Sequence, residues 1–244
     1  MKVTCTKAQA ATRQLDEAIV LLFADHDPLA IRTLAAAAHG ILADLVEHKL
    51  PGRSWRTKVI EDSGLSKKEA LAVLNSAQNY LKHADRDSGT ELSFDEEEND
   101  HVIFVATLEC AELGHPLSFG LQAFQIWYLA SYPEKIGAET EPVLKSRSAF
   151  PDLNKLAREA RLTRGAEFME SLDLSTKASC CLTHHLSGRL AAPLNSNVRL
   201  PGGWEEEGSV LLRGLGCREF LFNHRCWCHK VGSYQWLKPC MVSR

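Results

Sequence analysis

Apolar side chains recur every three or four positions in the N-terminal part of the chain, which is the spacing of helices with one buried face. The first such stretch spans Lys7 to Ala24. Asp27 and Pro28 then favour a new helix start, because an aspartate can accept hydrogen bonds from free backbone amides and a proline at the first helical position loses no helical bond. The second helix is expected to end near Lys49, before a Pro-Gly pair. We expect the two helices to pack as an antiparallel hairpin.

Helical periodicity continues beyond a short segment at Trp55 to Glu61. Ser66 and Glu69 have the spacing of a capping box, in which each side chain bonds a free amide at the helix start. Further helices are expected at Ser66 to His83, Asp95 to Leu113, Pro116 to Tyr132 and Pro151 to Leu172, with a loop rich in Glu, Pro and Ser before the last one. In that last helix, the residues expected to face inward are Leu153, Leu156, Ala160, Phe168 and Met169. No strand pattern competes, and the predicted fold class is all-α, a helical bundle of about five to six helices.

The character of the chain changes after residue 172. Helical periodicity fades, and from Gly208 onward six basic residues accompany one acidic residue. This part also holds six of the eight cysteines: Cys180, Cys181, Cys217, Cys226, Cys228 and Cys240. We therefore expect a helical bundle domain at 7–172 and a poorly ordered, basic, Cys-rich C-terminal extension at 173–244. A small second module is the alternative.

Composition and charge exclude some classes of protein. The hydrophobic fraction of 45% and the charged fraction of 24% are ordinary for a globular domain. A net charge of -3 gives no whole-chain signal for a polyanion partner, so any such site is expected to be local. No apolar run approaches the roughly 18 residues of a membrane-spanning helix, and the polar start lacks the apolar core of a signal peptide. These observations predict a cytoplasmic protein with reduced cysteines and no membrane partner.

Polar and charged groups are concentrated at the predicted end of the helix that begins at Ser66. Asn79 and His83 are four residues apart and so share a helix face, with Gln78 beside them. His83 lies in the last turn, where the negative end of the helix dipole favours a protonated imidazole. Positive charge is available from Lys82 and Arg86, and the neighbouring Asp85 and Gln78 are candidate ligand-binding residues. The alternative is a polar helix end in which His83 serves only as a cap and the aspartates form turn bonds.

The helix pair and the order Gln78-Asn79-x-x-x-His83 resemble the HEPN superfamily of helical domains. Its catalytic members carry Arg, then Asn, Asp or His, three variable residues and His. The resemblance covers Lys7 to Leu172, and the segment from Asn79 to Asp87 also resembles uncharacterised bacterial helical proteins. Active members of that superfamily are metal-independent ribonucleases that dimerise so that two motifs face one cleft. The resemblance implies that His83 corresponds to the catalytic histidine and Asn79 to the polar position.

One departure from the HEPN pattern changes the expected function. Gln78 stands where catalytic members have Arg, and a carboxamide cannot give phosphate a charged bidentate fork. We therefore expect a non-catalytic HEPN-like binding or interaction module, a homodimer whose partner is RNA or a protein, without cofactors. The alternative is a metal-independent ribonuclease in which His83 acts as general acid and base, with Asn79 and a cation from Lys82 or Arg86.

Two other groups of residues are candidates for a site. In the extension, soft ligands for zinc are present without the familiar paired spacing: Cys217, His224, Cys226, Cys228, His229 and Cys240. Aromatic and basic residues between Arg225 and Trp236 could instead stack on single-stranded nucleic acid. The acidic run from Asp95 to Asp100 is interpreted as a solvated helix start rather than a metal site. No metal site is predicted.

Overall fold

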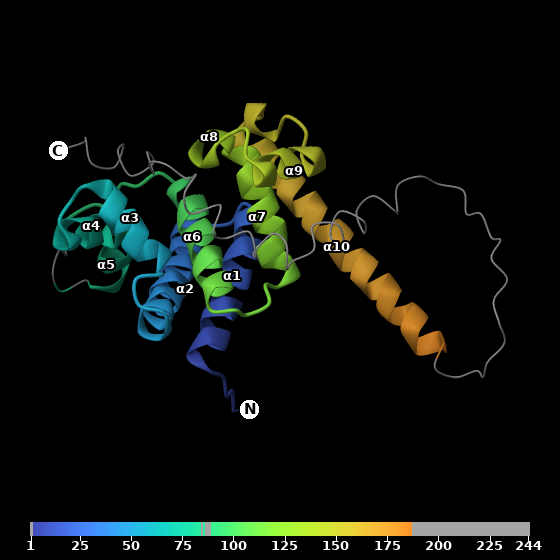
Figure 1. Cartoon of the computed structure of the whole chain (residues 1–244), viewed down its shortest axis with the longest axis horizontal. Helices are drawn as coiled ribbons and strands as arrows, with labels where there is room; N and C mark the ends of the chain where they lie inside the picture. The colour runs from blue at the N-terminus through green and yellow to red at the C-terminus, as the bar shows by residue number, and fades with distance from the viewer. Residues whose placement is uncertain (1, 84, 86–88, 187–244) are drawn as a thin grey trace.

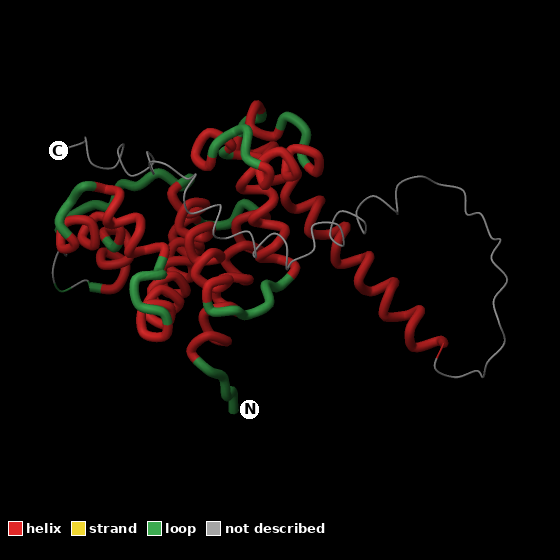
Figure 2. The backbone as a smooth tube through the Cα atoms, in the orientation of Figure 1, coloured by secondary structure: helices red, strands yellow, loops and turns green. Residues whose placement is uncertain are grey.

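The structure is a computed structural model that describes residues 2–83, 85 and 89–186, with side chains described to residue 172. In this part of the chain the backbone forms helices and no strands, which confirms the predicted all-α class (Figure 2). The helices are α1 Lys7–Phe23, α2 Pro28–Lys49, α3 Trp55–Ser63, α4 Lys67–Leu74, α5 Ser76–Lys82, α6 Glu98–Glu112, α7 Phe119–Ser131, α8 Pro133–Ile136, α9 Glu141–Ala149 and α10 Arg158–Leu186, with a 3-10 turn η1 at Leu153–Lys155.

The predicted hairpin of the first two helices is confirmed. The Asp27 carboxylate accepts from the backbone N–H groups of Leu29 at 2.8 Å and Ala30 at 3.2 Å, and Pro28 follows it in the first turn of α2. Thr6 and Gln9 cap α1 in the same reciprocal way that was expected for α4. Both helices end within a residue of the predicted positions. The prediction succeeds because caps and prolines act on backbone groups only a few residues away.

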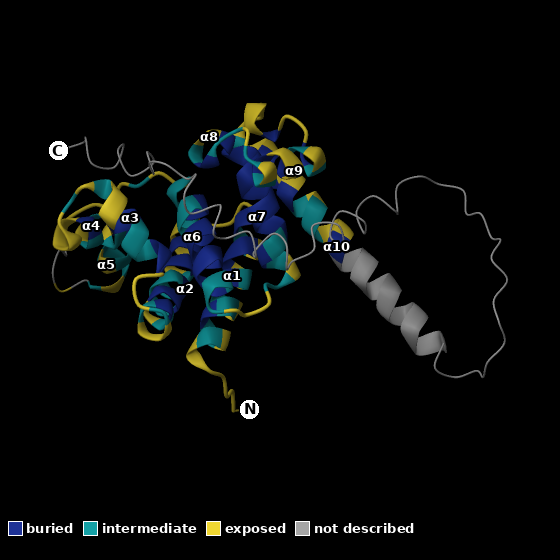
Figure 3. Ribbon diagram, viewed as in Figure 1, coloured by how far each residue is buried: buried dark blue, intermediate teal, exposed yellow. Residues whose placement is uncertain are grey.

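The hydrophobic core lies between α1, α2, α6 and α7 (Figures 1 and 3). Helix α7 contributes three large aromatic side chains, Phe124, Trp127 and Tyr128, which are all at most 1% exposed. Ser118 caps α7 by accepting from the Leu121 amide, so this helix begins at Phe119 and not at Pro116. Phe119, the first residue of α7, is 54% exposed. The remaining helices are arranged around this four-helix centre.

Helices α3, α4 and α5 form a small unit at one side of α2 (Figure 1). The capping box of Ser66 and Glu69 is confirmed, but the single helix predicted from Ser66 to His83 is wrong. It breaks at Asn75, whose backbone φ of -99° and ψ of 3° depart from helical values. The Ser76 hydroxyl also donates to the Val73 carbonyl at 2.9 Å, a local bond that competes with the helical pattern.

The segment between α7 and α10 is more ordered than the sequence predicted. The expected loop contains α8 and α9, each with a proline in its first turn. The last helix begins at Arg158, because η1 precedes it, and continues past residue 172 to Leu186. Consequently Leu156 and Ala160, which were expected to face inward, are exposed.

Helix α2 is the one helix among the described residues that is long and apolar enough to cross a membrane. Its best window has a mean hydropathy of 1.5, and 44% of that window is buried inside the bundle. Since α2 packs between α1 and α6, a core helix explains the same composition.

Candidate functional site

The sequence-predicted polar residues lie on α5 and in the turn after it. Asn79, Lys82 and Asp85 are exposed, whereas Gln78 and His83 are half-buried. His83 is the residue at which α5 ends, and its backbone N–H donates to the Asn79 carbonyl at 3.0 Å. The prediction for Arg86 falls outside the described residues. Asn79 and Lys82 therefore face solvent, while Gln78 turns toward the body of the protein.

Gln78 lies at a small cavity between α5 and the helices beneath it. The cavity has a volume of about 30 Å³. Its lining combines apolar side chains with polar groups from three directions: Ala36, His39, Arg56, Val59, Leu74, Asn75, Gln78, Val102 and Val105. Of the residues singled out on α5, this lining includes Gln78 and excludes Asn79, Lys82, His83 and Asp85. The structure thus divides the predicted residues between a cavity and a surface.

His39 of α2 is the most unusual group at this cavity. Its Nε2 atom is buried and has no hydrogen-bond partner among the described residues. Burial lowers the pKa of His39 to about 4, and the positive charges of Arg56 and Arg32 lower it further, against the opposing effect of Asp44. The ring is therefore neutral near pH 7, with one ring nitrogen as a donor and the other as an acceptor.

Arg56 is the charged residue of the cavity lining. Its guanidinium contacts the Asp44 carboxylate at 2.6 Å, and Asp44 itself is 73% exposed. The backbone of Arg56 is held by α6, because its N–H donates to Glu109 Oε1 at 2.9 Å. The same oxygen accepts from the Ser54 hydroxyl at 2.8 Å, so a buried carboxylate of α6 caps the start of α3. Burial raises the pKa of Glu109, since two hydrogen bonds only partly offset its loss of solvent.

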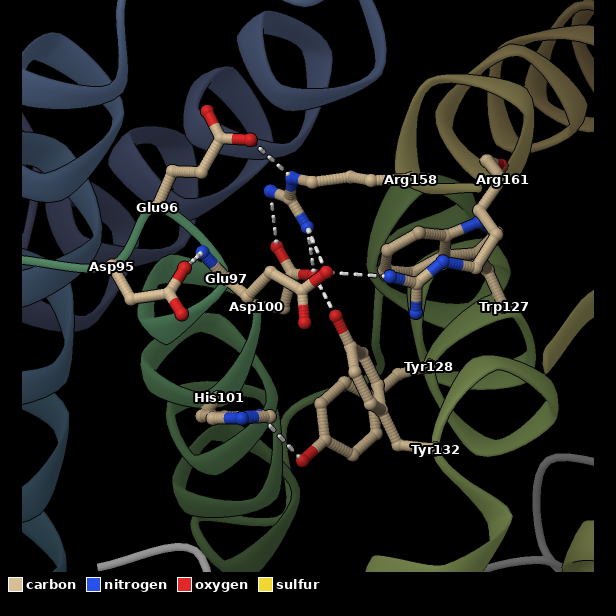
Figure 4. Close-up of polar contacts among 10 residues, drawn as sticks. All are labelled: Asp95, Glu96, Glu97, Asp100, His101, Trp127, Tyr128, Tyr132, Arg158 and Arg161. Atoms are coloured by element: carbon tan, nitrogen blue, oxygen red, sulfur yellow. Dashed lines mark hydrogen bonds and ion pairs between the residues drawn. The ribbon is translucent and has the colours of Figure 1, made fainter. Parts of the chain in front are cut away.

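A second polar cluster joins α6, α7 and α10 inside the bundle (Figure 4). Asp100, which is fully buried, accepts from two guanidinium nitrogens of Arg158 at 2.7 and 3.1 Å and from the Tyr132 hydroxyl at 2.6 Å. Arg158 also contacts Glu96 at 2.9 Å. Burial opposes the charge on Arg158, but the hydrogen bonds and charge of Asp100 raise its pKa, and so the guanidinium stays protonated.

Arg161 extends this cluster to α7. It contacts Glu97 at 2.6 Å and lies 5.0 Å from the centre of the Tyr132 ring. Its backbone carbonyl accepts from the Trp127 indole N–H at 2.7 Å. Every carboxylate of the cluster that is buried has a positively charged partner, so the cluster fixes α10 against the core. We assign it a structural role.

His101 and Tyr128 form a separate pair on the other side of Asp100 (Figure 4). His101 Nδ1 and the Tyr128 hydroxyl are 2.9 Å apart, and the two rings meet edge to face. Burial, followed by the charge of Lys135, lowers the pKa of His101 to about 3. The imidazole is therefore neutral at physiological pH.

The expectation of a solvated acidic run from Asp95 to Asp100 is wrong for its second half. Asp95 and Glu96 are exposed, but Asn99 and Asp100 are fully buried. The helix also begins at Glu98 and not at Asp95, because the Asp95 carboxylate accepts from the Glu97 amide and holds a turn before it. Asp100 is buried because Arg158, 58 residues away, provides its charge partner.

Sequence reasoning missed His39 as a site residue. A signal was present, because His39 interrupts the alanine-rich stretch of α2 seven residues after Arg32, and that spacing places both on one helix face. Nothing in the sequence showed that α3 and α5 would bring Arg56 and Gln78 to the same face. In the described residues, no group of three or more His, Cys, Asp and Glu side chains could hold a metal. The candidate zinc ligands from Cys217 to Cys240 lie outside them.

No family model, no curated protein and no solved structure matches this chain.

Proposed function

We propose that this protein is a non-catalytic, HEPN-like helical binding module, and that its ligand enters the cavity between α2, α3, α5 and α6. The observation that carries the proposal is the cavity lining, in which polar side chains from three helices, His39, Arg56 and Gln78, meet apolar walls. Binding sites commonly combine apolar walls with a few converging polar groups, as this cavity does.

The size of the cavity limits which part of a ligand it can hold. A volume of about 30 Å³ accommodates a group of a few atoms and not a whole nucleotide. The rest of a larger ligand would then lie on the surface beside α5, where Asn79 and Lys82 are exposed. This arrangement supports RNA or a protein as the larger partner, with one small group anchored in the cavity.

The proposal is tested by saturation-transfer NMR on the full chain with a fixed panel of probes. The panel holds a short single-stranded RNA, nucleoside monophosphates, amino acids and neutral sugars. Gln78→Ala removes the carboxamide at the cavity, and Glu61→Ala, at an exposed position of α3 outside the cavity lining, is the control. We expect at least one probe to bind the parent and the control and to lose binding in Gln78→Ala. If no probe binds, or if both variants lose binding equally, the proposal fails.

A metal-independent ribonuclease is the second candidate function. Its supporting observation is that Asn79 and Lys82 are exposed next to the half-buried His83 at the end of α5. RNA cleavage in EDTA, scored for cyclic phosphate ends, compares the parent with His83→Ala. Cleavage that disappears in this variant would establish the enzyme, and this candidate further requires a homodimer, which light scattering measures. Absence of cleavage in the parent excludes it.

A further inference from the structure

We propose that helix α10 carries a site for a zinc-type metal ion, formed by Cys180, Cys181, His184 and His185. Its basis is the length of α10, which continues past the predicted end at residue 172 and includes all four residues. They are separate from the side chains up to residue 172, among which no metal-binding group occurs. The site is also independent of the cavity between α2, α3, α5 and α6.

The helix gives the spacing of these residues a geometrical meaning. Cys180 and His184 are four residues apart, and so are Cys181 and His185. An α-helix rises about 1.5 Å per residue and completes a turn in about 3.6 residues, so residues four apart are neighbours about 6 Å apart on one face. In an extended chain the same spacing separates two residues by about 13 Å. The helix therefore brings each cysteine close to a histidine.

The two pairs are also adjacent to each other. Each residue advances about 100° around the helix, so the four positions lie within about 140° of its circumference. Cys181 and His184 are three residues apart, which is a second neighbour spacing. Zinc-binding helices with two histidines four residues apart use the same geometry to bind one ion through two side chains. On α10, four candidate ligands share one helix face.

The chemistry of the four residues selects the kind of metal. Two thiolates and two imidazoles are a donor set of tetrahedral structural zinc sites. Thiolate and imidazole ligands favour zinc, and cobalt as its spectroscopic substitute, over magnesium and calcium, which take oxygen ligands. A thiol loses its proton when it binds the ion, so binding releases protons. We therefore expect tighter binding at about pH 8 than at about pH 6.

The position of these residues in the fold indicates what the metal would do. Figure 1 shows that the last turns of α10 extend away from the other helices. A helix gains most of its stability from tertiary packing, and a helical end beyond its packing partners gains little. An ion that joins residues four apart connects two successive turns and stabilises the helical arrangement to which it binds. Metal binding should therefore increase the helical content of the protein.

The test begins with the full chain, reduced and metal-free, titrated with cobalt and then with zinc. We expect about one ion per chain, with thiolate-to-cobalt charge-transfer absorption and the visible bands of a tetrahedral site. Zinc should displace the cobalt and abolish both signals. Far-UV circular dichroism should show a gain in helix with zinc and none with magnesium. The site is excluded if the parent chain binds cobalt and zinc without thiolate ligation or fails to bind them.

Two double variants locate the ligands. Cys180→Ser with Cys181→Ser removes both thiols of α10, and Cys226→Ser with Cys228→Ser removes two thiols nearer the C-terminus as the matched control. The first variant should lose the charge-transfer absorption and weaken zinc binding by about tenfold or more, because thiolates are the strongest of the ligands. The control should keep both properties. The opposite result would place the metal outside α10 and overturn the proposal.

Two insertions test whether the helix face is needed. Two alanines between Leu182 and Thr183 keep every ligand but lengthen each Cys–His separation by two residues, so that none is three or four. Two alanines between His185 and Leu186 are the matched control and leave the spacing unchanged. The first insertion should weaken zinc binding by about tenfold or more, and the second should not. Equal binding in both would indicate adventitious binding by thiols and would overturn the site.

Discussion

Gly165 of α10 lies directly against the ring of Phe23 at the end of α1. A Cβ atom built on Gly165 would be 2.2 Å from Phe23 Cε1 and 2.5 Å from Cδ1. The ring cannot easily move away, because its other neighbours include Trp127, whose ring centre is 5.3 Å distant in an edge-to-face contact. The absence of a side chain at Gly165 therefore lets α10 approach the core.

Gly165→Ala is expected to destabilise the protein. Alanine is favoured over glycine inside a helix by about 1 kcal/mol, but here the added methyl group overpacks the core, at a cost of about 1 to 3 kcal/mol. We expect the second effect to be larger, so the free energy of unfolding in urea should fall. Gly40→Ala is the matched control in α2, where nothing lies within 4 Å of the added atom. That variant should gain up to about 1 kcal/mol. Equal gains in both variants would contradict the close packing of α10.

Arg158→Ala should be strongly destabilising, because it leaves the Asp100 carboxylate buried without its charge partner. Removing one member of a buried ion pair typically costs about 3 to 5 kcal/mol. Arg158→Lys should recover only part of this loss, since an ammonium group cannot form the paired hydrogen bonds at 2.7 and 3.1 Å. Chemical denaturation measures both variants. A loss of less than about 1 kcal/mol in Arg158→Ala would show that the cluster does not hold α10 in place.

How much of the fold could be predicted depends on how far apart the interacting residues lie. The start of α2 was predictable, because Asp27 caps amides only two and three residues away. The burial of Asp100 was not, since its partner is 58 residues away in a helix whose first residue was itself misplaced. The candidate site also combines a predictable local part and an unpredictable distant part. Gln78 was found from its neighbours in sequence, whereas its meeting with His39 and Arg56 depends on the packing of α2, α3 and α5.

Glu109→Ala should loosen the start of α3. Glu109 Oε1 accepts from both the Ser54 hydroxyl and the Arg56 amide inside the protein, so its removal leaves two donors without a partner. We expect a loss of about 1 to 3 kcal/mol and faster hydrogen exchange at the Arg56 amide. Glu69→Ala, at the exposed capping box of α4, is the control and should cost about 1 kcal/mol or less. If the two losses are the same and the Arg56 amide exchanges at its original rate, the carboxylate does not cap α3.

The free energy of unfolding should decrease as the pH is lowered, and part of this decrease should come from His39. Because burial lowers the pKa of this ring from 6.5 to about 4, the folded state holds fewer protons than the unfolded state between these values. The stability that His39 contributes is therefore present above about pH 6.5 and is lost as the pH falls toward 4, by about 3 kcal/mol at most. His39→Gln should flatten the curve of unfolding free energy against pH in this window, and His26→Gln, an exposed histidine, should not. His101, whose pKa is lowered to about 3, has the same sign and leaves a residual slope in both variants. An unchanged curve in His39→Gln would mean that the ring is not held neutral by burial.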